Sequence, residues 1–167
     1  RFWAHLLKKR IPGVRIAVGG PHVSLVPEQV LSRWNDVDYV VRYEGEKPFQ
    51  ALLEALEHSA SPASVPGLAY RDGSGKTILT ERCAPIQDLD SLPFPDIGLF
   101  HEGDSLVLKS VPIEGRYDLF DGPMAHVITS RGCPFKCKFC STSHFWEGTV
   151  RYRSPANVIA ELKEIRR

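Results

Sequence analysis

The chain has 167 residues, of which 43% are hydrophobic and 25% are charged, a composition typical of a folded globular protein. Lys and Arg number 21 against 20 Asp and Glu, so the formal net charge is only +1 at pH 7. This balance excludes the strong positive field that predicts nucleic-acid binding, and no apolar run reaches the ~20 residues of a membrane span.

The first 60 residues alternate between helical and strand-like patterns. In chain order the pattern predicts a helix over residues 2–10, a strand over 14–18, a helix around 30–34, a strand over 38–41 and a helix over 48–56. The first strand runs into Gly19-Gly20, as a buried strand entering a loop does. Alternating helices and strands predict an α/β fold with a doubly wound parallel sheet.

The middle of the chain has the character of a connector. Residues 59–62 (Ser-Ala-Ser-Pro) resemble a linker. Two short apolar runs, 68–71 and 77–80, flank residues 72–75 (Asp-Gly-Ser-Gly), whose turn chemistry predicts a β-hairpin. Residues 85–123 are rich in proline and show little periodicity, as expected of a segment that crosses a surface.

Regular patterns return near the C-terminal end. Residues 125–129 predict a strand that leads into a cysteine-rich loop, and Ser154 is expected to cap a helix with Pro155 in its first turn. The face of this helix that we expect to be buried consists of Val158, Ile159, Leu162 and Ile165. Strand, loop and helix in this order are the layout of the first unit of a β/α barrel. The chain starts in a helical pattern without an initiator Met, so we expect a fragment of a longer protein.

The cysteine loop is the strongest chemical signal in the sequence. Cys133, Cys137 and Cys140 lie within eight positions, whereas a secreted disulfide framework spreads its cysteines along the chain. This clustering predicts a metal site in a reducing compartment, and we expect a cytoplasmic protein. Three thiolates bind three irons of a four-iron cluster and leave the fourth iron open for a ligand. Gly132 allows a tight turn before the first ligand, and the isolated Cys83 is expected to be a free thiol.

The main alternative for this loop is zinc. His144 lies four residues after Cys140, so the three cysteines and His144 would make a Cys3His tetrahedron. Neighbouring aromatic and basic side chains would let such a zinc knuckle bind single-stranded nucleic acid. A knuckle needs no preceding buried strand and no following amphipathic helix, so the context favours the cluster. Taken alone, His144 is expected to be an ordinary loop histidine.

Residues 130–140 (Ser-Arg-Gly-Cys-Pro-Phe-Lys-Cys-Lys-Phe-Cys) resemble the signature loop of the radical S-adenosylmethionine superfamily. That signature has three cysteines separated by three and then two residues, with an aromatic residue before the last. The resemblance implies that Cys133, Cys137 and Cys140 hold a [4Fe-4S] cluster and that Phe139 lies beside the adenine of S-adenosylmethionine. It also implies a 5′-deoxyadenosyl radical, a small-molecule substrate and an electron donor such as flavodoxin or ferredoxin.

The N-terminal part resembles the end of a cobalamin-binding domain. The resemblance is carried by residues 18–24 (Val-Gly-Gly-Pro-His-Val-Ser), 38–41 and 44–46. Such domains are flavodoxin-like, and the resemblance implies that Gly19 and Gly20 let the backbone approach the cofactor's nucleotide tail at the edge where doubly wound sheets bind ligands. We expect His22 to cap this loop rather than to touch cobalamin.

Together the two resemblances imply a cobalamin-binding radical S-adenosylmethionine enzyme that catalyses methyl transfer or ring formation on an unactivated substrate. We expect residues 1–60 to be the C-terminal part of the cobalamin domain, 61–123 a connector with the hairpin, and 124–167 the first βα unit of a partial TIM barrel. A second enzyme reading, in which the N-terminal sheet is a vestigial scaffold without cobalamin, remains open. We expect this fragment alone to turn over nothing, because one strand and one helix cannot exclude water from a radical.

Overall fold

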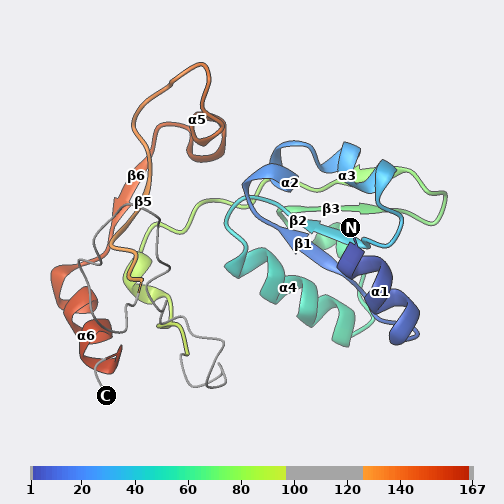
Figure 1. Ribbon diagram of the computed structural model, residues 1–167, viewed down its shortest axis with the longest axis horizontal. Helices are drawn as coiled ribbons and strands as arrows, with labels where there is room; N and C mark the ends of the chain where they lie inside the picture. Colours follow the sequence, from blue (N-terminus) through green and yellow to red (C-terminus); the bar gives the residue numbers. More distant parts are fainter. Residues whose placement is uncertain (1, 97–125, 166–167) are drawn as a thin grey trace, which may run out of the picture. The chain divides into compact units, whose positions relative to one another are not determined.

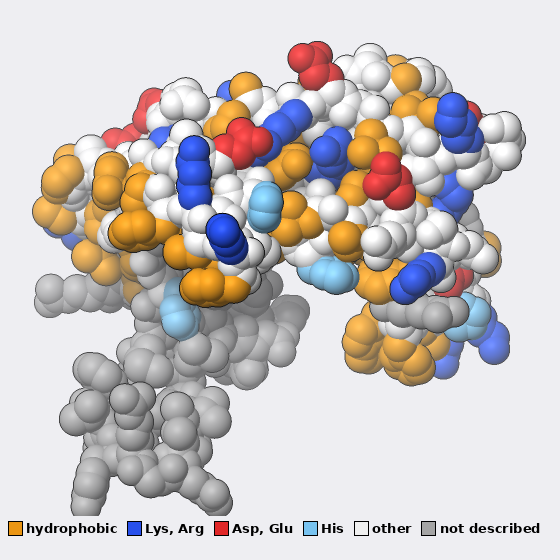
Figure 2. Space-filling model, turned by 90° about the horizontal axis from the view of Figure 1, so that it is seen from above, with side chains coloured by type: hydrophobic (Ala, Val, Ile, Leu, Met, Phe, Trp, Pro, Cys, Tyr) orange, Lys and Arg blue, Asp and Glu red, His pale blue; other side chains and the backbone are white. Residues whose placement is uncertain are grey.

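The computed structural model describes residues 2–96 and 126–165. By their contacts these residues form two compact units, one of residues 2–86 with 133–148 and the other of residues 87–96 and 126–132 with 149–165. In this division the cysteine loop belongs to the same unit as the N-terminal residues. Contacts alone do not define domains, so the domain boundaries expected from the sequence stay a prediction. On the face in Figure 2, side chains of both charge signs are interspersed with hydrophobic ones, in keeping with the net charge of +1.

The first unit is a small sheet with helices on both faces (Figure 1). Its elements are α1 (Phe2–Arg10), β1 (Ala17–Gly19), α2 (Pro21–Leu25), α3 (Pro27–Arg33), β2 (Tyr39–Val41), α4 (Glu46–Glu57), the 3-10 turn η1 (Pro62–Ser64), β3 (Leu68–Arg71), β4 (Thr77–Leu79) and α5 (Thr142–Trp146). In Figure 1, α2 and α3 lie on one side of the strands and α4 on the other. This arrangement confirms the predicted α/β fold.

The sheet has the strand order β1-β2-β3-β4. β1 and β2 are parallel, with Val18 opposite Val40, which confirms the predicted parallel pair. The predicted hairpin is also present, and β3 joins the free edge of β2 in antiparallel orientation, with Val40 opposite Ala69. The hairpin therefore completes the same sheet, because an unpaired edge of β2 would leave a row of backbone groups without partners.

Strand alternation sends the core side chains to two faces. Val40 and Ala69 belong to one hydrophobic cluster with residues from α1, α2 and α3. Tyr39, Val41 and Leu68 belong to the other, together with residues of α4 and β3. All three residues of β2 are buried, as expected of a central strand covered by helices on both faces.

The second unit contains η2 (Leu89–Ser91), β5 (Ser130–Gly132), β6 (Val150–Tyr152) and α6 (Pro155–Ile165). The strand predicted over residues 125–129 lies instead at β5, and β5 pairs with β6 in antiparallel orientation, with Arg131 opposite Arg151. Residue 125 lies outside the described residues. The observed strand differs from the predicted one because pairing with β6 sets which residues are extended. The local pattern of residues 125–129 carries no information about that partner.

The predicted C-terminal helix is confirmed, but its buried face is different from the prediction. The Ser154 hydroxyl accepts a hydrogen bond from the Asn157 amide at 3.1 Å, which is the expected N-cap. However, Ile159 and Leu162 are about half exposed, at 51% and 49%, whereas Glu161 is 3% exposed. Glu161 takes the buried position because it forms an ion pair with Arg153, which compensates for the removal of its charge from water.

No helix in residues 2–96 and 126–165 is long and apolar enough to cross a membrane.

Candidate functional site

The loop after β1 carries the two glycines expected to approach cobalamin. Gly20 precedes α2 with φ 105° and ψ 172°, a region that essentially only glycine adopts. A Cβ placed on Gly20 would meet no atom of the described residues within 4 Å, so this backbone borders open space. A Cβ on Gly19 would lie 3.5 Å from the Val41 carbonyl oxygen, toward the sheet. The geometry at Gly20 fits close approach of a ligand, and Gly19 is the exposed last residue of β1 beside it; their contacts with cobalamin stay a prediction.

A buried serine closes this loop. The Ser24 hydroxyl donates to the Gly20 carbonyl at 2.8 Å and accepts from the Tyr43 amide at 2.8 Å. Tyr43 follows β2 and has a left-handed backbone, with φ 62°. Ser24 is 2% exposed and closes the loop through these two hydrogen bonds, whereas His22 is exposed and its expected role as a cap stays a prediction. The available signal was a serine four residues after Gly20, followed by the apolar residues Leu25 and Val26.

The cysteine loop is a tight turn followed by α5. The Cys140 amide donates to the Cys137 carbonyl at 3.1 Å, and the Ser143 hydroxyl donates to the Cys140 carbonyl at 2.7 Å. Cys133 and Cys140 are half-buried and Cys137 is exposed. Gly132 has φ 116°, and a Cβ there would collide with the Thr149 carbonyl oxygen. Only glycine fits at this turn, as expected before the first cysteine.

The geometry of this loop does not support the zinc alternative. Zinc needs four ligand atoms within about 2.0–2.3 Å of one point. Among residues 2–96 and 126–165, no three His, Cys, Asp or Glu side chains lie close enough together to hold one metal ion, so His144 does not complete a Cys3His set. In a [4Fe-4S] cluster each thiolate binds a different iron, so the three cysteines need to surround a larger object. Cys133, Cys137 and Cys140 lie on one loop, with Cys137 exposed and the other two half-buried, and their binding of a cluster stays a prediction.

The chemistry at Cys140 favours a thiolate. A hydrogen bond from the Thr142 side chain, with further ones from the Thr142 and Ser143 amides, lowers the pKa of the Cys140 thiol from its ordinary value. Thiolates are the form that binds iron. Cys137 lies on a hollow of about 480 Å³ that is also lined by Lys136, Lys138, Ser143, His144 and Glu147. Phe139 is 93% exposed, so its ring is free to stack on a planar ligand.

Replacing Thr142 by Val in cluster-free protein is expected to raise the pKa of Cys140, because Val keeps the shape but lacks the hydroxyl donor. The thiolate is the reactive form and predominates above the pKa, so alkylation of Cys140 by iodoacetamide shifts to higher pH. The measurement is the rate of Cys140 modification over a pH series, followed by mass spectrometry. Thr77→Val in β4 serves as the control, and an unchanged profile for Thr142→Val would contradict this assignment.

The helix after the cysteines packs on the glycine side of the first unit. Phe145 of α5 is 6% exposed, and its ring lies 5.5 Å from the Tyr43 ring, centroid to centroid. The Arg82 guanidinium lies 3.7 Å from the centroid of the Tyr43 ring and donates to the Phe145 carbonyl at 3.0 Å. α5 also contacts α2, the helix that follows Gly20. The two predicted cofactor loops are thus brought to one edge of the sheet, by residues that no sequence pattern singled out.

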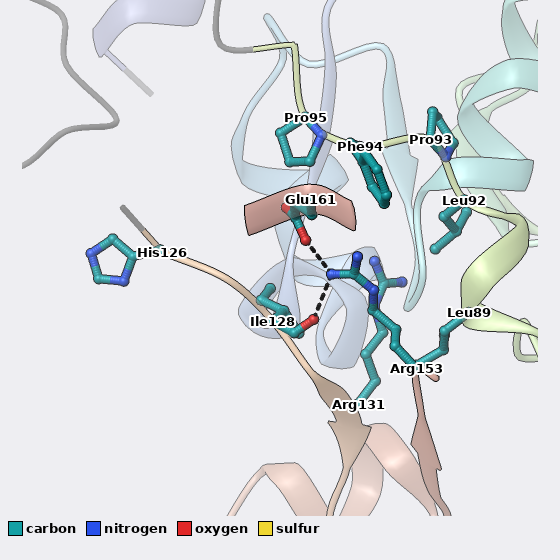
Figure 3. A pocket seen from close by; sticks show the side chains of 10 residues that line it. All are labelled: Leu89, Leu92, Pro93, Phe94, Pro95, His126, Ile128, Arg131, Arg153 and Glu161. Atoms are coloured by element: carbon teal, nitrogen blue, oxygen red, sulfur yellow. Dashed lines mark hydrogen bonds and ion pairs between the residues drawn. The ribbon is translucent and has the colours of Figure 1, made fainter. Parts of the chain in front are cut away.

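The second unit contains a separate cavity of about 260 Å³ (Figure 3). Its charged centre is already paired: Arg153 forms an ion pair with Glu161 and donates to the Ile128 carbonyl at 2.9 Å. Nearby, the Asp90 carboxylate accepts from the Ser154 amide at 2.9 Å. Hydrogen bonds from Ser154 and the charge of Arg153 lower the pKa of Asp90. These contacts attach the connector to α6, which is a structural role.

Comparison with known proteins gives a consistent picture. Residues 2–53 match the B12 binding domain family. The chain is 35% identical over 160 residues to an uncharacterized methyltransferase of Pyrococcus horikoshii, covering 95% of this chain and 32% of that protein. It is 32% identical over 161 residues to the anaerobic magnesium-protoporphyrin IX monomethyl ester cyclase of Rubrivivax gelatinosus, covering 95% of this chain and 27% of that enzyme. The chain thus spans between about a quarter and a third of the length of these curated relatives.

Solved structures agree on the fold. The cobalamin-dependent S-adenosylmethionine radical enzyme OxsB, with aqua-cobalamin and S-adenosylmethionine bound, matches 98% of this chain and 20% of its own with a TM-score of 0.67 at 24% identity. The radical S-adenosylmethionine methyltransferase TsrM from Kitasatospora setae, with cobalamin and a [4Fe-4S] cluster bound, matches 98% of this chain and 31% of its own with a TM-score of 0.62 at 17% identity. Between them, these two structures contain the three cofactors expected from the sequence: cobalamin in both, S-adenosylmethionine in the first and a [4Fe-4S] cluster in the second. The resemblance expected from the sequence is confirmed: residues 2–53 match the B12 binding domain family, and almost the whole chain is similar to cobalamin-dependent radical S-adenosylmethionine enzymes.

Proposed function

We propose that this chain is the part of a cobalamin-dependent radical S-adenosylmethionine enzyme that brings its cofactor sites together. The observation that carries the proposal is the placement of the Gly20 loop and the cysteine loop at one edge of the first unit, where α2 contacts α5. Methyltransferases and cyclases among the relatives support methyl transfer or ring formation on a small molecule as the reaction class.

The predicted site residues have separate roles in binding the three cofactors. Cys133, Cys137 and Cys140 would hold the [4Fe-4S] cluster, and the exposed Phe139 ring would stack against the adenine of S-adenosylmethionine. When bound, the cluster supplies the electron that splits S-adenosylmethionine into methionine and a 5′-deoxyadenosyl radical. Gly20 would admit the cobalamin tail to the backbone, since its Cβ position is open. Gly19 is the exposed last residue of β1 and would approach the cofactor beside Gly20.

We also propose that the electron comes from a low-potential protein such as flavodoxin or ferredoxin. We further propose that the enzyme of which this chain is part works in the cytoplasm. The support is the cluster of thiols, since a free thiol group of this kind persists in a reducing compartment.

The experiment uses the full-length protein after anaerobic reconstitution with iron and sulfide, incubated with hydroxocobalamin, S-adenosylmethionine and dithionite. We expect 5′-deoxyadenosine and methionine, which are the products of one-electron cleavage. S-adenosylhomocysteine in addition would identify methyl transfer, because this product forms only when the methyl group leaves. Cleavage without cobalamin binding would favour the scaffold reading, and neither product from cluster-loaded protein would refute the proposed function.

A further inference from the structure

A continuous series of contacts joins the glycine loop to the cysteine loop. It begins at the Gly20 carbonyl, which accepts from the buried Ser24 hydroxyl at 2.8 Å. The same hydroxyl accepts from the Tyr43 amide at 2.8 Å. A left-handed backbone at Tyr43 is uncommon for a bulky residue and persists only where the surroundings hold it. The Ser24 hydrogen bond is one such restraint, so the position of Tyr43 depends on the Gly20 loop.

Arg82 continues the series from Tyr43 to α5. Its guanidinium stacks over the Tyr43 ring at 3.7 Å from the centroid, within the range of a cation–π interaction. One terminal nitrogen donates to the Phe145 carbonyl at 3.0 Å and the other pairs with the Glu147 carboxylate. These two acceptors lie at the C-terminal end of α5, where carbonyls lack intrahelical partners. Arg82 therefore holds the end of the helix that follows Cys140.

The residue type matters for this role. A planar guanidinium stacks on a ring with its face while its edge donates to two acceptors, whereas a lysine ammonium is a point charge that cannot do both. The Arg82 side chain is 28% exposed, so the contact is partly shielded from water and salt. Phe145, which is 6% exposed, adds a ring contact with Tyr43 on the same side. The link therefore combines packing, hydrogen bonds and charge at a single side chain.

We propose that Arg82 is a positioning residue that couples the two cofactor loops, so that a ligand ordering the Gly20 loop also orders α5 and the cysteines before it. This inference rests on the proposed function, because it takes Gly20 and the cysteines as the two sites. Contiguous contacts of this kind are a physical route for coupling free energy between sites, and only a measurement of coupling shows that a given route is used. The coupling is reciprocal, so a filled cysteine loop strengthens binding at the Gly20 loop by the same factor.

The test is hydrogen exchange of the full-length, cluster-free protein with and without hydroxocobalamin. In the wild type, hydroxocobalamin is expected to slow exchange at the amides of Phe145 and Glu147, which bond to Ser141 and Ser143, by at least about fivefold, the lower end of usual coupling factors. In Arg82→Ala this slowing is lost, although cobalamin still binds. Arg82→Lys retains the positive charge but lacks the planar guanidinium with its two donor nitrogens. This variant is expected to show less than half of the wild-type slowing of exchange. Arg33→Ala, at an exposed arginine of α3, keeps the wild-type response.

A second measurement separates coupling from a folding defect. Exchange at the buried β2 amides reports whether each variant is folded. In the wild type, loading the cluster is expected to tighten hydroxocobalamin binding by at least about fivefold, the lower end of usual coupling factors, and Arg82→Lys is expected to reduce that gain. If the wild type binds hydroxocobalamin but α5 is unaffected, or if a folded Arg82→Ala still transmits the effect, the coupling is refuted and the proposed function stands. If the wild type binds no hydroxocobalamin, the cobalamin assignment fails and the coupling fails with it.

Discussion

Replacing Cys133, Cys137 and Cys140 together by Ala is expected to abolish uptake of iron and sulfide by the anaerobically reconstituted protein. Three thiolates are the full set of protein ligands for a cluster with one open iron, and without them nothing else in the loop replaces sulfur ligation. The measurement is iron and sulfide content per chain together with the visible thiolate-to-iron absorption. We expect the wild type to bind close to a full cluster and the triple variant to bind only background iron.

Cys83→Ala is the matched control for this experiment. The Cys83 sulfur lies outside the loop and contacts the Ala84 carbonyl at 3.7 Å, so its loss removes a thiol without touching the predicted ligands. Cluster content of this variant should equal that of the wild type. A colourless wild-type protein with one tightly bound zinc would overturn the cluster assignment.

Gly20→Val in the full-length protein is expected to weaken hydroxocobalamin binding by at least about tenfold, which corresponds to about 1.4 kcal/mol. The backbone at Gly20 has φ 105° and ψ 172°, and its Cβ position faces open space where we place the cofactor tail. A side chain there would occupy that space. It would also strain the backbone by about 1–3 kcal/mol, because non-glycine residues avoid this conformation. Absorption titration with hydroxocobalamin measures the first effect and urea unfolding the second.

Two further variants separate strain from steric blocking. Gly20→Ala carries the same backbone strain with a smaller side chain, so it should lose similar stability and less affinity than Gly20→Val. Gly73→Ala makes the same change in the hairpin turn, where a Cβ meets open space without a left-handed backbone, and it should leave both properties unchanged. Equal affinity of Gly20→Val and the wild type would exclude Gly20 from the cobalamin site.

Two arginines attach the ends of short helices to the sheet of the first unit. Arg71 of β3 donates to the Leu31 carbonyl at 2.7 Å and to the Asn35 carbonyl at 3.1 Å, which ties the end of α3 to the sheet. In the same unit, Arg82 ties the end of α5 to Tyr43. In both places an arginine satisfies carbonyls at a helix terminus that would otherwise lack partners. The chain thus uses long cationic side chains to attach short helices to a small sheet.

The sequence by itself determined the features that depend on neighbouring residues. The spacing of Cys133, Cys137 and Cys140 identified the loop and its family, and the strand-like run ending at Gly19 identified the parallel pair. The apolar periodicity of α4 and the Ser154 cap of α6 were likewise readable, because helical spacing and capping involve residues only a few positions apart.

Only the tertiary structure decided the features that join distant residues. The pairing of β5 with β6 moved the predicted strand, and the ion pair of Arg153 with Glu161 replaced the predicted apolar face of α6. Arg82 contacts Tyr43, which lies 39 positions earlier in the chain, and Phe145, which lies 63 positions later. Local periodicity carries no information about such partners, because which distant side chains meet depends on how the whole chain packs. That packing is what brings the glycine loop and the cysteine loop to one edge of the sheet.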